Sequence, residues 1–312
     1  MPFEPAYLSL LRSGELQNRV DQAFRRLESC DICPRQCSVN RCQSAEGAAC
    51  HTGVRAVVSG YNPHFGEEAP LVGTGGSGTI FFAWCNLKCQ YCQNYETSQL
   101  GEGYQVEPEQ LAAMMLQLQD MGCHNINFVS PTHVVPQILA AVWTAAQAGL
   151  HLPLVYNTGG YDALQTLRLL DGVFDIYMPD MKYADEPSAR RLSKIQDYPA
   201  INRAGVAEMY RQVGDLSLDE RGIARRGLLV RHLVLPSGLA GTAEIVRFLA
   251  EEISRNTYLN IMDQYRPCYR ASALPDLDRR ITSAEYAAAV RLALEAGLTR
   301  LDDRQATFLC WT

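Results

Sequence analysis

The chain has 312 residues, of which 47% are hydrophobic and 20% are charged. This length and composition suit one α/β barrel with an extension, and they support a sizeable core. The formal net charge is −6 and no basic stripe runs along the sequence, so we expect no nucleic-acid partner, because phosphate backbones are bound by clustered Lys and Arg.

The N-terminal part of the chain predicts one helix followed by a cysteine-rich extension. Apolar residues recur at helical spacing between residues 14 and 28. Residues 30–70 are rich in Gly, Pro, Asn and Cys, which indicates a loop-rich element stapled by a metal. We therefore divide the chain into an extension over residues 1–70 and a core over residues 71–312.

From Gly73 onward, apolar strands alternate with amphipathic helices. The predicted strands cover residues 79–84, 124–129, 152–157, 174–178, 228–235 and 258–262. The predicted helices cover residues 107–121, 134–148, 161–170, 188–195, 206–213, 243–254 and 283–296. Six β/α units imply an α/β fold with a parallel sheet and right-handed crossovers.

The eleven cysteines point to a reducing compartment rather than to secretion. Seven of them fall in two tight clusters, whereas a secreted disulfide framework would be shorter and more evenly spaced. The first twenty residues lack a basic segment before an apolar core, and no apolar run is long enough to span a membrane. We expect a cytoplasmic protein with no membrane partner.

One cluster, Cys85, Cys89 and Cys92, has the spacing C-x3-C-x2-C directly after the first predicted strand. Three thiolates can bind three irons of a [4Fe–4S] cluster and leave the fourth iron open, whereas ordinary electron-transfer clusters use four thiolates. The three thiols could instead be buried small hydrophobes on one helix face, or they could bind zinc, although structural zinc sites usually have four protein ligands. A strand that delivers ligands to a loop favours an active site at the top of a barrel.

These cysteines and their surroundings resemble the radical S-adenosylmethionine (SAM) superfamily. The residues that carry the resemblance are Cys30–Cys37, Gly76–Asn94, and the blocks at 125–133, 155–161, 175–183 and 230–236. Together they resemble the members that are catalogued as pyruvate formate-lyase-activating-enzyme-like. The resemblance implies an open (β/α)6 partial barrel of the TIM type with a Cys-rich N-terminal extension.

The resemblance also implies the chemistry. A [4Fe–4S] cluster would reductively cleave SAM to methionine and a 5′-deoxyadenosyl radical, which abstracts a hydrogen atom from a substrate. The electron would come from a low-potential donor such as flavodoxin or ferredoxin. The substrate could be a glycine of a partner enzyme, which would be activated as a glycyl radical, or it could be a small molecule or another peptide.

Several polar residues at the predicted strand ends match positions that contact SAM in the family. Ser130 and Thr132 stand where many members have a Gly-Gly-Glu stretch that receives the methionyl amine. This chain has no carboxylate there, so the Thr132 hydroxyl and backbone carbonyls are the candidates. Asn157 and Thr158 resemble the residues that meet the SAM ribose and carboxylate, although they could merely cap the following helix.

Three charged residues complete this set as candidate catalytic residues. Asp180 and Lys182 match an Asp-x-Lys pair of glycyl-radical-activating enzymes, and Arg231 matches an arginine that approaches SAM. A guanidinium suits a carboxylate through paired hydrogen bonds. Asp180 and Lys182 could also be a simple ion pair. Tyr91 precedes the third cysteine, where the family's residue lies beside the adenine.

Other polar residues near these blocks have simpler interpretations. His133 and His232 could contact ligand or could be ordinary hydrogen-bonded histidines. We expect the adjacent Glu67 and Glu68 to be a solvated pair, with substrate contact as the alternative.

The second cysteine cluster has the composition of a closed four-sulfur metal site. Cys30, Cys33, Cys37 and Cys50 could bind zinc or a second iron–sulfur cluster, and Cys42 is a spare that leaves the fourth ligand open. The remaining cysteines are isolated and suit core or surface positions; they are Cys123, Cys268 and Cys310. Cys268 could also face the substrate. The competing hypothesis from another class is a non-catalytic iron–sulfur or zinc protein.

Overall fold

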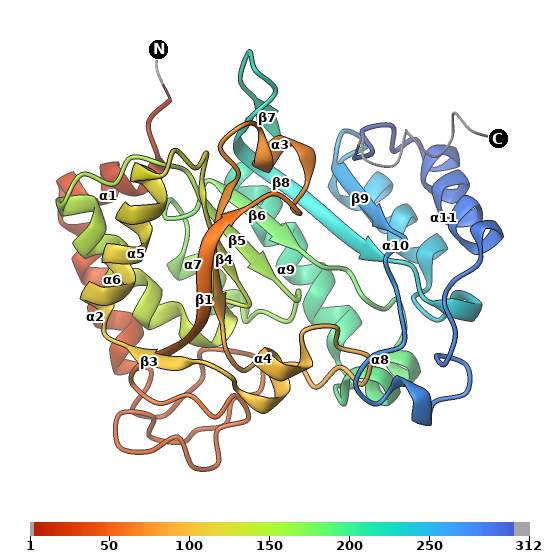
Figure 1. Ribbon diagram of the computed structural model, residues 1–312, viewed down its shortest axis with the longest axis horizontal. Helices are drawn as coiled ribbons and strands as arrows, with labels where there is room; N and C mark the ends of the chain where they lie inside the picture. The colour runs from red at the N-terminus through yellow and green to blue at the C-terminus, as the bar shows by residue number, and fades with distance from the viewer. Residues whose placement is uncertain (1–2, 303–312) are drawn as a thin grey trace.

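A curved central sheet organises the computed structural model, which describes residues 3–302 (Figure 1). Six of its strands are parallel to their neighbours and follow one another in chain order. They are β2 (Ser77–Phe82), β4 (Ile126–Val129), β5 (Leu154–Thr158), β6 (Ile176–Pro179), β8 (Ala224–Leu233) and β9 (Tyr258–Met262). The predicted α/β fold with six parallel strands is therefore confirmed.

Helices connect the parallel strands, and local sequence signals mark where several of these helices begin. Proline stands in the first turn of four of them, where its missing N–H is not needed. Capping boxes begin α5 and α11, at Glu107 with Gln110 and at Thr282 with Glu285. The helices are α4 (Tyr95–Leu100), α5 (Pro108–Asp120), α6 (Val135–Gln147), α7 (Leu164–Leu169), α8 (Glu186–Ser193), α9 (Tyr198–Val213), α10 (Thr242–Phe248) and α11 (Ser283–Glu295).

The N-terminal residues extend this sheet and its helical layer. The helices α1 (Ala6–Ser13) and α2 (Glu15–Arg25) pack against α6 (Figure 1), and Gly14 separates them in a left-handed conformation with φ 78°. The strand β1 (Ala56–His64) pairs antiparallel with β2 and also with β3 (Tyr104–Val106). A short helix, α3 (Ala69–Val72), then leads into β2, and at the other side β7 (Ser217–Leu218) pairs with β8.

The structure corrects two local predictions. Residues 30–70 are not loop throughout, because β1 lies within them. The sequence did not predict this strand because its Gly60, Asn62 and Pro63 are poor strand formers. The helix α9 begins at Tyr198 rather than at residue 206, with Pro199 in its first turn.

The core lies on both faces of the sheet. Alternate strand residues such as Ile126 and Phe128 join the large buried cluster beneath the helices, whereas Val155, Met178 and Leu229 belong to a cluster on the other face, inside the barrel. This alternation directs the polar residues near the carboxyl ends of the strands toward the barrel mouth. Between residues 3 and 302, no helix has both the length and the apolar character that crossing a membrane requires.

Candidate active site

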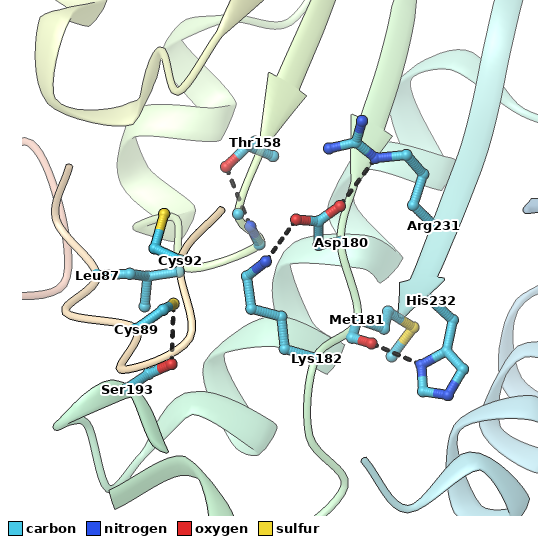
Figure 2. A network of polar contacts seen from close by, with 12 residues as sticks. Leu87, Cys89, Cys92, Thr158, Asp180, Met181, Lys182, Ser193, Arg231 and His232 are labelled. Atoms are coloured by element: carbon cyan, nitrogen blue, oxygen red, sulfur yellow. Dashed lines mark hydrogen bonds and ion pairs between the residues drawn. The ribbon is translucent and has the colours of Figure 1, made fainter. Parts of the chain in front are cut away.

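The loop that carries Cys85, Cys89 and Cys92 follows β2 and lies at the carboxyl ends of the parallel strands (Figures 1 and 2). Cys89 is buried, and the other two are half-buried. Burial and the neighbouring Cys89 and Cys92 raise the pKa of Cys85 to about 12, which places the three thiols in one electrostatic group. The structure thus brings together the three cysteines that the sequence singled out.

Each thiol of this group has a polar neighbour. The Leu87 backbone N–H donates to Cys85 Sγ over 3.4 Å. Ser193 Oγ lies 3.0 Å from Cys89 Sγ (Figure 2), and Ser98 Oγ lies 3.0 Å from Cys92 Sγ. Such donors suit thiolates, which are acceptors only.

Three thiols with these donors suit the ligation of a [4Fe–4S] cluster. Among residues 3–302, no three or more His, Cys, Asp or Glu side chains are grouped so that they could hold a metal ion. In a [4Fe–4S] cluster each thiolate binds a different iron, so its ligands need not converge on one point.

The last turn of α8 holds the cysteine loop in place. The backbone N–H groups of Lys88 and Gln90 donate to the carbonyls of Ser193 and Leu192, over 3.3 and 2.8 Å. On the other side, Asn86 Nδ2 donates to the Tyr161 carbonyl over 2.7 Å. The loop is therefore anchored to two segments that follow β5 and β6.

Asp180 is the centre of a buried charge cluster next to this loop (Figure 2). It accepts hydrogen bonds from Lys182 Nζ over 2.6 Å and from Arg231 Nε over 2.8 Å. Arg231 Nη2 also donates to Asn157 Oδ1 over 2.7 Å. The structure thus joins three of the predicted SAM-contacting residues and the candidate catalytic Lys182 across β5, β6 and β8.

Charge balance decides the protonation of this cluster. Burial alone would raise the pKa of Asp180, but the positive charges of Arg231 and Lys182 outweigh it and hold the pKa below its ordinary value. Burial lowers the pKa of Lys182, and Asp180 and Cys89 reverse this and raise it. The carboxylate and the ammonium therefore stay charged, with Lys182 close enough to act on the thiols.

Thr132 and Thr158 face a different partner from the one expected. Both hydroxyls donate to the buried carboxylate of Asp162 over 2.7 Å, and Tyr156 OH donates to it over 3.0 Å. The Thr132 hydroxyl is thus already engaged within the protein. The sequence analysis missed Asp162, although it directly follows the polar block at residues 155–161.

Ser130 and Tyr91 occupy different surroundings. Ser130 is half-buried at the end of β4, with φ 59°, and it lines a cavity of about 160 Å³ together with Asn94 and Ser98. Tyr91 is buried, and its hydroxyl lies 2.7 Å from that of Tyr183. Only Ser130 of these two borders an open space at the barrel mouth.

The prediction that Glu67 and Glu68 are solvated is wrong. Their exposed fractions are 9% and 3%. Glu68 Oε1 accepts a hydrogen bond from Asn260 over 2.8 Å, and Glu67 Oε2 lies 3.9 Å from Arg231 Nη1. Burial, opposed by Arg231, raises the pKa of Glu68. The fold turns this pair into the barrel because α3 packs its Leu71 against the interior cluster.

Some buried polar atoms inside the barrel form no hydrogen bond with the described residues. Glu68 Oε2 and both side-chain polar atoms of Asn127 have no hydrogen-bond partner there. Asn127 alternates with Ile126 and Phe128, which belong to the core beneath the helices, so its side chain faces the interior.

Both histidines near the predicted blocks are hydrogen-bonded and buried. His133 Nε2 pairs with the Ala83 carbonyl over 3.0 Å, and burial, together with Arg41, lowers its pKa to about 3. His232 pairs with the Met181 carbonyl and with Thr242 Oγ1. Both side chains therefore fit the interpretation as ordinary hydrogen-bonded histidines.

The second cysteine cluster is also gathered by the fold. Cys30, Cys33 and Cys50 are buried and Cys37 is half-buried, whereas Cys42 is exposed. Burial and the nearby Cys50, Cys30 and Cys37 raise the pKa of Cys33 to about 12. Cys50 is thus the better placed fourth ligand.

The extension reaches the first cysteine loop directly. Arg35 Nε donates to the Asn86 carbonyl over 2.9 Å. Of the isolated cysteines, Cys123 is buried and Cys268 is half-buried, and Cys310 lies outside the described residues.

Comparisons with known proteins match part of the chain to a known family and most of it to one relative. The model of the radical SAM superfamily matches residues 79–214. An uncharacterized protein of Methanocaldococcus jannaschii is 31% identical over 309 residues, which cover 95% of this chain and 83% of that protein.

Two solved structures are similar at low identity. A radical SAM methyltransferase from Sphaerobacter thermophilus is 14% identical with a TM-score of 0.47, over 70% of this chain and 64% of that one. SuiB from Streptococcus suis, solved with its precursor peptide SuiA, is 10% identical with a TM-score of 0.46, over 68% of this chain and 43% of that one. The chain thus spans less than two thirds of the length of either structure.

Proposed function

Because this chain belongs to the radical SAM superfamily, we propose that it binds a [4Fe–4S] cluster on Cys85, Cys89 and Cys92 and uses SAM to abstract a hydrogen atom from a substrate. When bound and reduced, such a cluster supplies the electron that cleaves the sulfonium of SAM and releases a 5′-deoxyadenosyl radical. The protein binds, orients and shields the reactants.

The observation that carries this proposal is the placement of the Asp180 charge cluster beside the three-thiol loop. Burial raises the pKa of Cys89, and the positive charge of Lys182 opposes this rise. A cation at this position would stabilise thiolate ligands.

Arg231 and Asn157 provide the polar contacts for SAM in this proposal. Arg231 Nε and Nη2 are engaged by Asp180 and Asn157, and this fixes the plane of the guanidinium. The carboxylate of SAM is the group that a fixed guanidinium would orient. Ser130 borders the open cavity at the barrel mouth and is the candidate at the second-strand position.

SAM cleavage tests the proposal. The protein would be reconstituted anaerobically with iron and sulfide, reduced, and given SAM, and 5′-deoxyadenosine would be quantified. We expect product from the parent protein and from Cys42→Ala, an exposed cysteine outside the site, but not from Cys89→Ala. Equal yields from the parent and Cys89→Ala would refute the proposal.

For the substrate, we propose a glycine of a partner enzyme, which would be activated as a glycyl radical. Asp180, Lys182 and Arg231 support this version because they match residues of glycyl-radical-activating enzymes. The electron would come from a low-potential donor such as flavodoxin or ferredoxin. A glycyl-type electron paramagnetic resonance (EPR) signal in a co-encoded partner is the test, and its absence across the co-encoded candidates would count against this version.

A second version is the modification of a small molecule or another peptide. The unused polar atoms of Glu68 and Asn127 favour it, because an unsatisfied buried polar group costs about 1–3 kcal/mol unless a ligand or water completes it. Detection of a modified small molecule or peptide, rather than of a glycyl radical, would distinguish this version.

We also propose a second metal site on Cys30, Cys33, Cys37 and Cys50. Its four thiols and the contact from Arg35 to the first cysteine loop support a structural metal that fixes the extension. Among the described residues no three of these thiols are grouped as a metal ion requires, so a zinc ion would have to draw them together. Metal analysis of a Cys85/Cys89/Cys92→Ala variant tests this. Zinc alone would reject a second iron–sulfur cluster, and iron with sulfide would establish one.

A further inference from the structure

Ser193 connects the cysteine loop to a buried pair of tyrosines. Its hydroxyl lies 3.0 Å from Cys89 Sγ (Figure 2) and 2.6 Å from Tyr183 OH. Tyr183 OH in turn lies 2.7 Å from Tyr91 OH. All four residues are buried, with exposed fractions of 0% for Ser193 and at most 8% for the others. The four groups therefore form a continuous hydrogen-bonded chain in the buried interior.

The sulfur at the end fixes the direction of this chain. A cysteine that binds a metal is a thiolate, which accepts hydrogen bonds and donates none. Ser193 must then donate its single proton to Cys89 Sγ, so its oxygen accepts from Tyr183. Tyr183 likewise has one proton to give, so its oxygen accepts from Tyr91. Three hydroxyl dipoles thus point toward one thiolate.

We propose that Ser193, Tyr183 and Tyr91 are positioning residues that raise the reduction potential of the cluster through Cys89. The inference rests on the proposed function, because it requires a cluster on the three-cysteine loop. Hydrogen bonds to the sulfurs are among the factors that set iron–sulfur potentials, since they stabilise the added negative charge of the reduced state. Hydrogen bonds in a chain also polarise one another in a low-dielectric interior.

The fold holds this chain rigidly. Ser193 is the last residue of α8, and Lys194 ends the helix in a left-handed conformation with φ 57°. The same turn accepts hydrogen bonds from the backbone of Lys88 and Gln90, so the serine hydroxyl is kept at a fixed distance from the loop. The Tyr183 ring packs edge-on against Tyr198, whose hydroxyl bonds to the carbonyls of Gly159 and Asp180. The chain is thus tied to the strand ends that bear the charge cluster.

The midpoint potential of the reconstituted full-length protein, followed by the EPR signal of the reduced cluster, tests the inference. We expect a more negative potential in Ser193→Ala, a smaller shift of the same sign in Tyr183→Phe, and the smallest in Tyr91→Phe. Tyr265→Phe is the matched control: its ring packs 5.8 Å from that of Tyr91, but its hydroxyl donates to the Leu277 carbonyl. Its potential should equal that of the parent protein.

Two further variants separate the hydrogen bond from packing. Ser193→Thr keeps a hydroxyl and should restore the parent potential, whereas a shift as large as that of Ser193→Ala would overturn the inference. If Ser193→Ala fails to hold a cluster, Tyr183→Phe decides, because it leaves the Ser193 contact to Cys89 in place. A parent potential in Tyr183→Phe would overturn the inference while leaving the proposed function intact. A parent protein that assembles no cluster at all would overturn both.

Discussion

Asp180 and Arg231 are joined twice, through their side chains and through their backbones. The carboxylate accepts a hydrogen bond of 2.8 Å from the guanidinium Nε, although 51 positions separate the two residues. Their backbones also form a parallel bridge, and the Met181 N–H donates to the Arg231 carbonyl over 2.8 Å. The end of β6 is therefore locked to β8 at the point where Lys182 turns toward the cysteines.

Replacing Asp180 by Asn should damage both stability and SAM cleavage. The variant keeps the shape of the side chain but leaves Lys182 and Arg231 as two buried cations without their anion. Breaking a buried ion pair costs about 3–5 kcal/mol, so we expect the free energy of unfolding to fall by roughly 3 kcal/mol. Because the guanidinium loses its orientation, 5′-deoxyadenosine formation should fall by about tenfold or more.

An exposed ion pair provides the control for this variant. Asp171 lies 2.6 Å from Arg211, and their side chains are 40% and 56% exposed. Asp171→Asn should cost at most about 1 kcal/mol and leave SAM cleavage unchanged. Both variants would be compared by denaturant unfolding and by the 5′-deoxyadenosine assay. If Asp180→Asn behaved like Asp171→Asn in both, the expected role of Asp180 would be contradicted.

Asp162 should matter for stability more than any one of the hydroxyls that it binds. Asp162→Ala leaves the buried hydroxyls of Thr132, Thr158 and Tyr156 without this acceptor. Thr132 Oγ1 and Thr158 Oγ1 lie 3.0 Å apart and can still pair, so two of the three hydroxyl protons are left without an acceptor. At about 1–3 kcal/mol for each unsatisfied group, the total should be on the order of 3 kcal/mol. Thr132→Val removes only one of these donors and should cost about 1 kcal/mol. Equal losses in the two variants, measured by denaturant unfolding, would show that Asp162 does not organise these strand ends.

Gly160 should not tolerate a side chain. It adopts φ 79°, and a Cβ would lie 2.1 Å from the Asp180 carbonyl oxygen. Tyr198 OH and Asn202 Nδ2 both donate to this same oxygen, so it has no free direction in which to move. Gly160→Ala should therefore lower the free energy of unfolding by about 3 kcal/mol or more, and should shift Asp180 enough to reduce SAM cleavage.

A second glycine separates the clash from backbone strain. Gly14 adopts the left-handed conformation with φ 78°, but a Cβ there would meet no atom within 4 Å. Gly14→Ala should cost only the left-handed conformation, about 1–2 kcal/mol, without an effect on SAM cleavage. If Gly160→Ala were no worse than Gly14→Ala in either measurement, the close approach to Asp180 would have no consequence.

The parts of the fold that could be predicted are those with strong local signals. The six parallel strands are apolar runs separated by helical periods, and the cysteine motif stands directly after one of them. By contrast, β1 contains Gly60, Asn62 and Pro63 and gains its stability from pairing with β2. Its strand character is a tertiary effect that propensity opposes.

The missed parts of the site depend on contacts between distant residues. Ser193 lies 104 positions from Cys89, and no motif marks it in the sequence. Glu67 and Glu68 look solvated as two adjacent charges, and only the fold brings Glu68 to Asn260, 192 positions away. Local sequence indicates where strands end, whereas the partners of each polar group follow from how the strands are assembled.

The carboxyl group of Asp175 should make stability depend on pH in a direction opposite to that of an ordinary paired carboxylate. Burial raises its pKa to about 7, against the hydrogen bonds from the Ala6 and Leu154 N–H groups and the charge of Arg226. In the unfolded chain an Asp has a pKa of about 3.9. Since the folded pKa is the higher one, the contribution of Asp175 is fully present below about pH 4 and is lost as the pH rises toward about 7.

The Asp175→Asn variant should lack this dependence. One pKa unit corresponds to about 1.4 kcal/mol, so the stability of the parent relative to the variant should fall by on the order of 4 kcal/mol between about pH 4 and pH 7. The two proteins are compared by how the free energy of unfolding changes with pH and not by its absolute value. The absolute value also changes, because an amide accepts fewer hydrogen bonds than a carboxylate. Denaturant unfolding of both proteins at several pH values measures the change with pH. Parallel curves would mean that Asp175 is ionised in the folded protein throughout this range, and that the Ala6 and Leu154 N–H groups offset its burial.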